Sequence, residues 1–118
     1  MFHILVVDDD KNTRQLIKAV LETENYIVIG ATDGEDALKV LDRSHIDLVI
    51  LDVMMPKMDG YEFTEILRRV QNELPILMVS AKQLPADRNK GFIVGTDDFM
   101  TKPFDEEELL LRVKALLW

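Results

Sequence analysis

The sequence predicts an α/β domain in which helices cover both faces of a parallel sheet. Five short apolar segments alternate with five helical patterns along the chain. Two of the segments, "HILVV" at 3–7 and "DLVIL" at 47–51, are almost continuously apolar, as strands buried on both faces must be. Strict alternation of strand and helix favours a parallel sheet with right-handed crossovers. We therefore expect a doubly wound sheet of five strands.

Each expected strand is a short run of apolar residues. In chain order the five runs are His3–Val7, Tyr26–Ile29, Asp47–Leu51, Ile76–Val79 and Asp98–Met100. Loops are expected where turn-forming residues gather, at "TDGED" (32–36), "KMDG" (57–60) and "GTDD" (95–98). Asp33 and Asp59 are expected to cap the helices that follow them, and Asp10 to begin the first helix.

Four of the five expected helices carry one apolar stripe with i, i+3, i+4 spacing. The stripes consist of Leu16, Ile17, Val20 and Leu21; Ala37, Leu38 and Leu41; Phe63, Ile66, Leu67 and Val70; and Leu109, Leu110, Val113, Leu116 and Leu117. The remaining pattern, at about Pro85 to Val94, is weaker because it contains Gly91.

Composition excludes several classes of protein. The 118 residues fit one domain, 1–118, with no internal repeat or linker that would suggest a second. The lack of cysteine excludes disulfides, thiolate nucleophiles and cysteine-ligated zinc. A net charge of −8 disfavours direct binding to nucleic acid. No apolar run approaches the roughly 20 residues that span a bilayer, so no membrane association and a cytoplasmic location are expected.

Charged and polar residues follow four of the five expected strands. They are Asp8 and Asp9 after the first, Asp52 after the third, Ser80 after the fourth and Lys102 after the fifth. Ligands of doubly wound domains bind beyond these carboxyl ends. Clustered carboxylates suit a hard cation, Mg²⁺ first, while an ammonium and a hydroxyl can bind an anion. This is the outline of a phosphoryl-transfer site.

The nucleophile of such a site is expected to be a carboxylate. The chain has no cysteine, and Ser80 has no histidine near it in the sequence to act as a base. His3 and His45 precede strands and are expected to be structural or solvated. An EF-hand read from Asp8 fails at Thr13 and Ala19. The glycine-rich nucleotide-binding motifs are also absent.

Four motifs, "ILVVDDD", "DLVILDVMMPKMDG", "SAK" and "GTDDFMTKPF", occur in an order and spacing that resemble the receiver domain of two-component response regulators. The likeness covers the whole chain. It implies a flavodoxin-like sheet of order 2-1-3-4-5. It also implies a signalling phosphoacceptor that is not an enzyme, although it assists its own phosphorylation and dephosphorylation.

The resemblance assigns a role to each residue of the motifs. Asp52 becomes the phosphoacceptor, which receives a phosphoryl group from a sensor histidine kinase. Mg²⁺ is held by Asp8, Asp9, Asp52 and the backbone carbonyl of Met54, with Asp8 mainly outside the inner coordination sphere. Lys102 contacts the phosphoryl group, and its bond to Pro103 is cis. Ser80 and Phe99 form the switch, and Phe99 stands where the family often has tyrosine. Phosphorylation is expected to draw Ser80 inward and to let Phe99 move in from the surface.

The motifs "DVMMP", "TKPF" and "EEELLLRVKALL" further resemble the branch whose receivers precede a winged-helix DNA-binding domain. The resemblance implies a homodimer on phosphorylation, formed through the fourth helix, fifth strand and fifth helix. Asp98 with Arg112, and Arg88 with Glu108, match its intersubunit ion pairs. The expected transcriptional output would depend on an effector domain that this chain lacks.

Two other interpretations compete with a phosphorylation-switched receiver. One is a Mg²⁺-dependent phosphatase or phosphotransferase with an aspartyl nucleophile. Such an enzyme needs a general acid near Asp52, but Met54 stands two residues on, and there is no cap insertion. The other is a stand-alone signalling or binding module.

Met54 and Lys82, two residues beyond Asp52 and Ser80, give no general-base help to water, so a long-lived phosphorylated state is expected.

Overall fold

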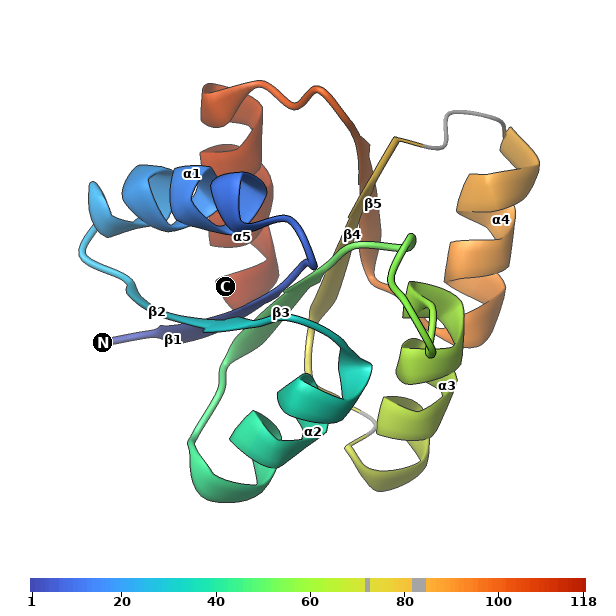
Figure 1. Cartoon of the computed structure of the whole chain (residues 1–118). Coiled ribbons are helices and arrows are strands. Elements are labelled where there is room, and N and C mark those ends of the chain that lie inside the picture. Colours follow the sequence, from blue (N-terminus) through green and yellow to red (C-terminus); the bar gives the residue numbers. More distant parts are fainter. Residues whose placement is uncertain (72, 82–84) are drawn as a thin grey trace.

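A computed structural model describes residues 1–71, 73–81 and 85–118 of the chain. Strands and helices alternate strictly from one end to the other (Figure 1). In chain order they are β1 (His3–Val7), α1 (Lys11–Glu22), β2 (Ile27–Ala31), α2 (Gly34–Arg43), β3 (Leu48–Leu51), α3 (Gly60–Val70), β4 (Ile76–Ser80), α4 (Pro85–Val94), β5 (Asp98–Thr101) and α5 (Glu106–Leu117). The predicted α/β class is confirmed.

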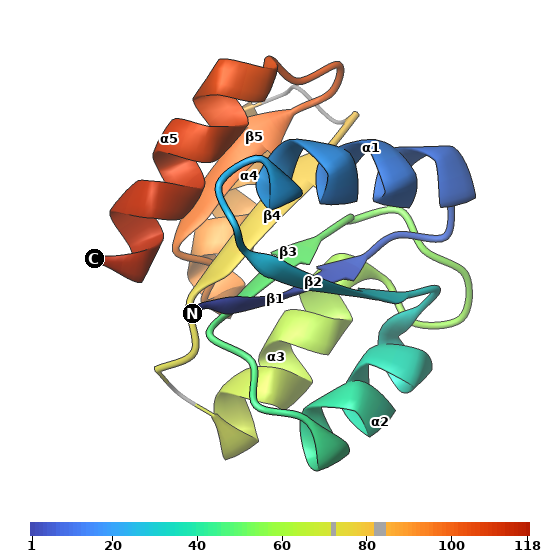
Figure 2. The same cartoon turned by 90° about the vertical axis from the view of Figure 1, so that its left-hand side faces the viewer.

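The five strands form one parallel sheet of order β2-β1-β3-β4-β5, as the resemblance implied. Helices α1 and α5 cover one face, and α2, α3 and α4 lie on the other, as Figure 2 shows in side view. Two apolar cores follow from this arrangement. Ile17 of α1 and Leu109 of α5 pack in one, and Ala37 of α2 and Phe63 of α3 pack in the other. Successive strand residues alternate between these cores, because strand side chains point to opposite faces.

The helix starts are largely those expected from the sequence. Asp10, Asp33 and Asp59 each occupy the N-cap position, and each carboxylate accepts a backbone N–H of the first turn. Asp105 caps α5 in the same way, although the sequence analysis did not single it out. No helix of the described residues is long and apolar enough to cross a membrane.

Several boundaries and exposures differ from expectation. Strand β2 begins one residue later than predicted and continues to Ala31, because Gly30 and Ala31 pair with the end of β1. Leu16 and Val70 were expected on buried stripes, but they are 47% and 72% exposed. Leu16 lies at the edge of its helix's apolar stripe, and Val70 is the last residue of α3.

The loop between β3 and α3 folds tightly against the end of β3. Gly60 makes this approach possible: a Cβ there would lie 2.5 Å from the backbone oxygen of Asp52 and 2.8 Å from the Cα of Val53. The Gly60 N–H also donates to the carbonyl oxygen of Val53. The turn therefore holds the backbone around Asp52 in one place.

Candidate functional site

Three carboxylates meet beyond the carboxyl ends of the two central strands. Val7 of β1 is in register with Leu51 of β3, so Asp8 and Asp52, the next residues, lie side by side. The Asp52 N–H donates to the carbonyl oxygen of Val7 at 2.9 Å. One carboxylate oxygen from each of Asp8, Asp9 and Asp52 lies within 4.8 Å of the others. The predicted convergence of these three residues is confirmed.

Lys102 brings a positive charge to the same cluster. Its Nζ lies 2.8 Å from Oδ2 of Asp8 and 3.6 Å from Oδ1 of Asp52. Its backbone N–H donates to the carbonyl oxygen of Ser80, which ties the end of β5 to the end of β4. The Lys102–Pro103 bond is cis, as the resemblance implied. Burial lowers the pKa of Lys102, but the hydrogen bond to Asp8 and the charge of Asp52 outweigh burial, and the pKa is raised.

The site makes ionisation of Asp52 costly. Burial raises the pKa of Asp52 above its ordinary value of 3.8, and the negative charge of Asp8 raises it further. Lys102 and a backbone hydrogen bond from Met54 act in the opposite direction but do not cancel the rise. A second cation would relieve this repulsion, so the cluster favours metal binding.

Replacing Asp52 by Asn should stabilise the metal-free domain at neutral pH, because it removes a buried carboxylate that is costly to ionise. The raised pKa means that the folded state keeps the Asp52 proton more readily than the unfolded chain. The cost of ionisation is therefore absent below the unfolded value of 3.8, grows as the pH rises, and is complete above the folded pKa. Urea unfolding of both proteins from pH 4 to pH 8 without divalent cations measures the difference. A constant difference across this range would contradict it.

The donor set fits Mg²⁺. Carboxylate and carbonyl oxygens are the ligands of hard cations, and no thiol or imidazole lies among the three carboxylates. Both oxygens of Asp8 are already engaged, since Oδ1 accepts the N–H of Asp10 and Oδ2 contacts Lys102. Asp9 is exposed and makes no ion pair with any residue that the structure describes. Asp9 and Asp52 are thus the carboxylates best placed to hold the ion directly.

The remaining predicted residues surround the carboxylates. Ser80 is fully buried at the end of β4. Phe99 on β5 is only 2% exposed, so the expected surface position of its ring is wrong for this conformation. The ring lies against α4, where a Cβ on Gly91 would be 3.3 Å from it. Met54 is 58% exposed beside the cluster, and Lys82 lies outside the described residues.

The residues of the expected dimer surface lie along β5, α4 and α5. Arg112 contacts two carboxylates of its own chain: its Nη1 lies 2.9 Å from both oxygens of Asp98, and its Nε lies 2.9 Å from Glu108. These hydrogen bonds raise the pKa of Arg112. Arg88 is exposed on α4. The two pairs remain predictions as contacts between subunits.

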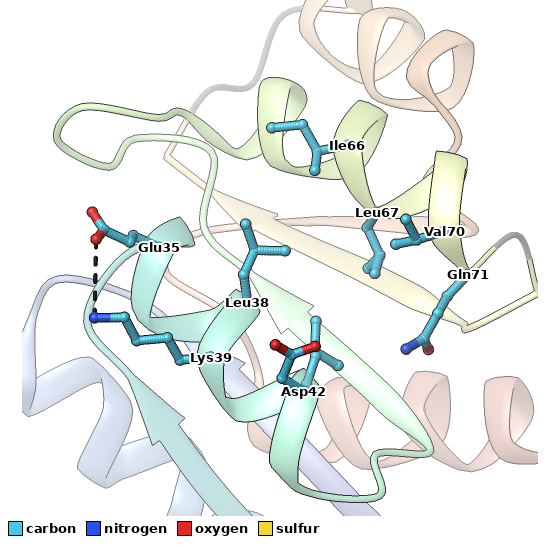
Figure 3. Close-up of a pocket in the computed structure, with 9 residues that line it drawn as sticks. Glu35, Leu38, Lys39, Asp42, Ile66, Leu67, Val70 and Gln71 are labelled. Atoms are coloured by element: carbon cyan, nitrogen blue, oxygen red, sulfur yellow. Dashed lines mark ion pairs between the residues drawn. The ribbon is translucent and has the colours of Figure 1, made fainter.

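A groove between α2 and α3 has a mainly apolar lining, unlike the carboxylate cluster at the strand ends. It measures about 450 Å³, and side chains of both helices face it in Figure 3. Its apolar lining includes Leu38, Leu41 and Val70, and its polar rim holds an exposed ion pair between Glu35 and Lys39. It contains no group of carboxylates comparable with the one at the strand ends, among the residues described.

The sequence analysis missed a second group at the opposite end of β1 and β3. His3 and His45, expected to be structural or solvated, both lie beside Asp47. Part of this proximity could have been predicted from the sequence. Once β1 and β3 are known to be neighbouring parallel strands, the residues at or just before their starts must also be neighbours. The rotamers that bring His45 to Asp47 could not be read from the sequence.

Comparisons with known proteins match nearly the whole chain. A family model described as response regulator receiver domain matches residues 4–114. The alkaline phosphatase synthesis transcriptional regulatory protein PhoP of Bacillus subtilis is 47% identical over 114 residues, which are 97% of this chain and 48% of that protein. The transcriptional regulatory protein CpxR of Escherichia coli K12 is 45% identical over 117 residues, 99% of this chain and 50% of that protein. The chain thus spans about half the length of these relatives.

Solved structures show the same fold. The receiver domain of the Francisella response regulator 1452 superposes with a TM-score of 0.94 at 35% identity, and the match covers 99% of this chain and 97% of that one. The BeF3-activated DrrB receiver domain superposes with a TM-score of 0.91 at 36% identity, covering 99% and 97%. The similarity therefore extends over the whole α/β unit, including every strand that bears a site residue.

Proposed function

Because this chain belongs to the response regulator receiver family, we propose that Asp52 accepts a phosphoryl group from a sensor histidine kinase. The observation that carries the proposal is the cluster of Asp8, Asp9 and Asp52 with Lys102 at its side. An oxygen of Asp52 attacks the phosphorus, the phosphorus–nitrogen bond of the phosphohistidine breaks, and the electron pair of that bond stays on the imidazole. The product is an acyl phosphate.

Each residue has a role in this transfer. The buried backbone around Asp52, held by Gly60, fixes the direction of attack. Lys102 lies between Asp8 and Asp52 and can move its ammonium to the incoming phosphoryl oxygens. Ser80 supplies a hydroxyl from the next strand. Mg²⁺, held by Asp9, Asp52 and the Met54 carbonyl, would supply the positive charge that phosphoryl oxygens require.

Mass spectrometry tests the phosphoacceptor directly. Incubation with Mg²⁺ and a small acyl phosphate donor should add one phosphoryl group per chain, and Asp52→Asn should add none. Asp59→Asn is a matched control, because Asp59 is an exposed cap whose carboxylate accepts the Glu62 N–H, and asparagine caps equally well. Full phosphorylation of the Asp52 variant would refute the assignment.

We also propose that phosphorylation switches the surface of α4, β5 and α5 and promotes a homodimer. Ser80 and Phe99 lie on neighbouring strands in front of α4, so movement of the hydroxyl toward a phosphoryl group changes the space next to the ring. Such a change biases an existing equilibrium between two conformations of this surface. The two relatives are named as transcriptional regulatory proteins, so the output of the switch in a cytoplasmic full-length protein would be control of transcription, through a DNA-binding domain.

Beryllofluoride with Mg²⁺ should shift the domain from monomer to dimer in sedimentation velocity. Arg112→Glu should suppress the shift, because it places a like charge beside Asp98 and Glu108, both of which Arg112 now contacts. Arg43→Glu, at the end of α2 on another surface, is the matched charge reversal and should dimerise normally. An unchanged sedimentation profile of the wild type would count against the proposed dimer.

The phosphatase alternative finds no support in this site. Such an enzyme needs an acid that protonates the leaving group beside the nucleophile. Met54 occupies the position two residues beyond Asp52, and its thioether is exposed and cannot donate a proton. The proposed role is therefore that of a signalling phosphoacceptor.

A further inference from the structure

Arg14 of α1 holds the backbone from which Asp9 projects. Its Nη1 donates to the carbonyl oxygen of Asp8 at 2.6 Å. That carbonyl belongs to the peptide that joins Asp8 to Asp9. Because a peptide is planar, fixing its oxygen also fixes the bond from which Asp9 continues. Arg14 thus acts on the turn of three aspartates from a position outside it.

The path of the Arg14 side chain depends on Gly30 of β2. A Cβ on Gly30 would lie 3.5 Å from Cδ and 3.8 Å from Nε of Arg14, so the side chain crosses bare backbone there. Gly30 is in register with Val6 of β1. The next residue, Ala31, accepts the Asp8 N–H through its carbonyl oxygen at 3.1 Å. Strand β2 therefore fixes the N–H of Asp8 and gives Arg14 a surface along which to reach the Asp8 carbonyl.

Asp9 depends on this backbone more than its neighbours do. The side chain of Asp8 is held separately, since it contacts Lys102 and accepts the N–H of Asp10. Asp10 is held as the N-cap of α1. Asp9 is exposed, and within the described ranges no ion pair restrains its carboxylate. The direction of Asp9 therefore follows from the peptide before it, which Arg14 anchors.

We propose that Arg14 is a positioning residue of the magnesium site, which keeps Asp9 directed at the space beside Asp52. The inference rests on the proposed function, in which Asp9 and Asp52 hold the ion. A guanidinium stays charged throughout the pH range of a folded protein, and a hydrogen bond from a charged donor is roughly twice as strong as one from a neutral donor. Loss of a partner that orients a metal ligand typically weakens metal binding by roughly 10- to 100-fold.

The charge of Arg14 alone predicts the opposite effect. Removing a cation from the surroundings of the site reduces the repulsion of Mg²⁺ and should tighten its binding. A positioning role predicts weaker binding, because Asp9 would then sample directions in which it cannot reach the ion. The sign of the change in the dissociation constant of Mg²⁺ therefore separates the two effects.

Magnesium titrations followed by backbone amide NMR signals measure this constant without any phosphorylation. In Arg14→Met, which keeps an apolar chain over Gly30 but donates no hydrogen bond, the Kd of Mg²⁺ should rise about tenfold or more. Arg14→Lys can still donate to the Asp8 carbonyl, so its Kd should fall between those of Arg14→Met and the wild type. Lys18→Met is the matched control. It removes an exposed cation of α1 that lines the same surface groove as Arg14, and it should bind Mg²⁺ at least as tightly as the wild type.

Phosphorylation and unfolding give two further measurements. At saturating Mg²⁺, Arg14→Met should be phosphorylated at close to the wild-type rate, because Asp52 and Lys102 are unchanged. A purely structural role of Arg14 would lower the thermal unfolding midpoint and leave the Kd of Mg²⁺ for the folded protein unchanged.

Two results would overturn this inference alone. One is a Kd of Arg14→Met equal to or below that of the wild type, and the other is an equal loss of affinity in Lys18→Met. Wild-type shifts that do not centre on Asp9 and Asp52 would instead refute the proposed magnesium site, and this inference with it. Helix α1 keeps its buried apolar residues in every variant. Should Arg14→Met nevertheless unfold, Arg14→Gln, whose amide is too short to reach the carbonyl, repeats the comparison with a polar side chain.

Discussion

Replacing Asp9 by Asn should abolish Mg²⁺-dependent phosphorylation of Asp52 while the domain stays folded. Asp9 is exposed and makes no ion pair with the described residues, so the fold does not depend on its charge. Binding of the metal ion does depend on the charge of Asp9, because a neutral amide is a much weaker ligand than a carboxylate. A bound divalent cation contributes several kcal/mol to the stabilisation of transferring phosphoryl charge. Since each 1.36 kcal/mol is a factor of ten, the rate should fall by about two orders of magnitude or more.

The adjacent aspartate provides a control. Asp10→Asn removes the same charge one residue further on, and asparagine keeps the N-cap that Asp10 provides through its hydrogen bonds to Asn12 and Thr13. This variant should be phosphorylated at a rate close to that of the wild type. Phosphate incorporation is measured by mass over time at several Mg²⁺ concentrations, and circular dichroism confirms the fold. Undiminished phosphorylation of Asp9→Asn would remove it from the metal site.

The convergence of the carboxylates with Lys102 could be predicted because it depends on topology alone. In a parallel sheet the carboxyl ends of all strands meet at one edge, so Asp8, Asp52 and Lys102 converge whatever their separation in the sequence. The apolar runs alone locate the strand ends to within about two residues. Side-chain conformation plays no part in that inference, and this is why it holds.

Features that depend on side-chain packing were not predictable in the same way. The burial of Phe99 depends on the space that Gly91 leaves on α4, and the exposure of Leu16 and Val70 depends on how far neighbouring elements extend. The meeting of His3 and His45 at Asp47 required both the strand order and a particular rotamer. A periodic pattern gives the average face of a helix or strand and does not describe these local arrangements.

The carboxylate cluster also explains an apparent conflict in the sequence, where an apolar strand runs directly into three aspartates. The structure separates their roles. Asp8 is buried and neutralised by Lys102, Asp9 is exposed, and Asp10 caps α1. Only the charge of Asp52, buried next to Asp8, remains poorly compensated. The unfavourable free energy of holding several negative charges together therefore falls mainly on Asp52, the residue that would receive the phosphoryl group.

Replacing Met54 by Asn should accelerate loss of the phosphoryl group from Asp52, by several-fold to about a hundredfold. The acyl phosphate is lost when water attacks the phosphorus in line, so a group that orients this water lowers the barrier. Met54 lies two residues beyond Asp52 with its side chain exposed at the site. A thioether neither orients water effectively nor takes its proton, and its flexible chain can cover the approach. Assistance by a positioned polar group is typically worth about two orders of magnitude.

The comparison that isolates this effect is Met54→Leu, which keeps an apolar side chain of similar volume and offers water no hydrogen bond. Each protein is phosphorylated, freed of donor, and followed by mass as the phosphoryl group is lost in the presence of Mg²⁺. We expect Met54→Leu to lose its phosphoryl group at the same rate as the wild type. The wild type should retain its phosphoryl group for much longer than a few seconds. Equal decay of Met54→Asn and wild type, or loss from the wild type within seconds, would show that Met54 does not protect the acyl phosphate. A slow wild type and a fast asparagine variant would make residue 54 the determinant of how long the signal lasts.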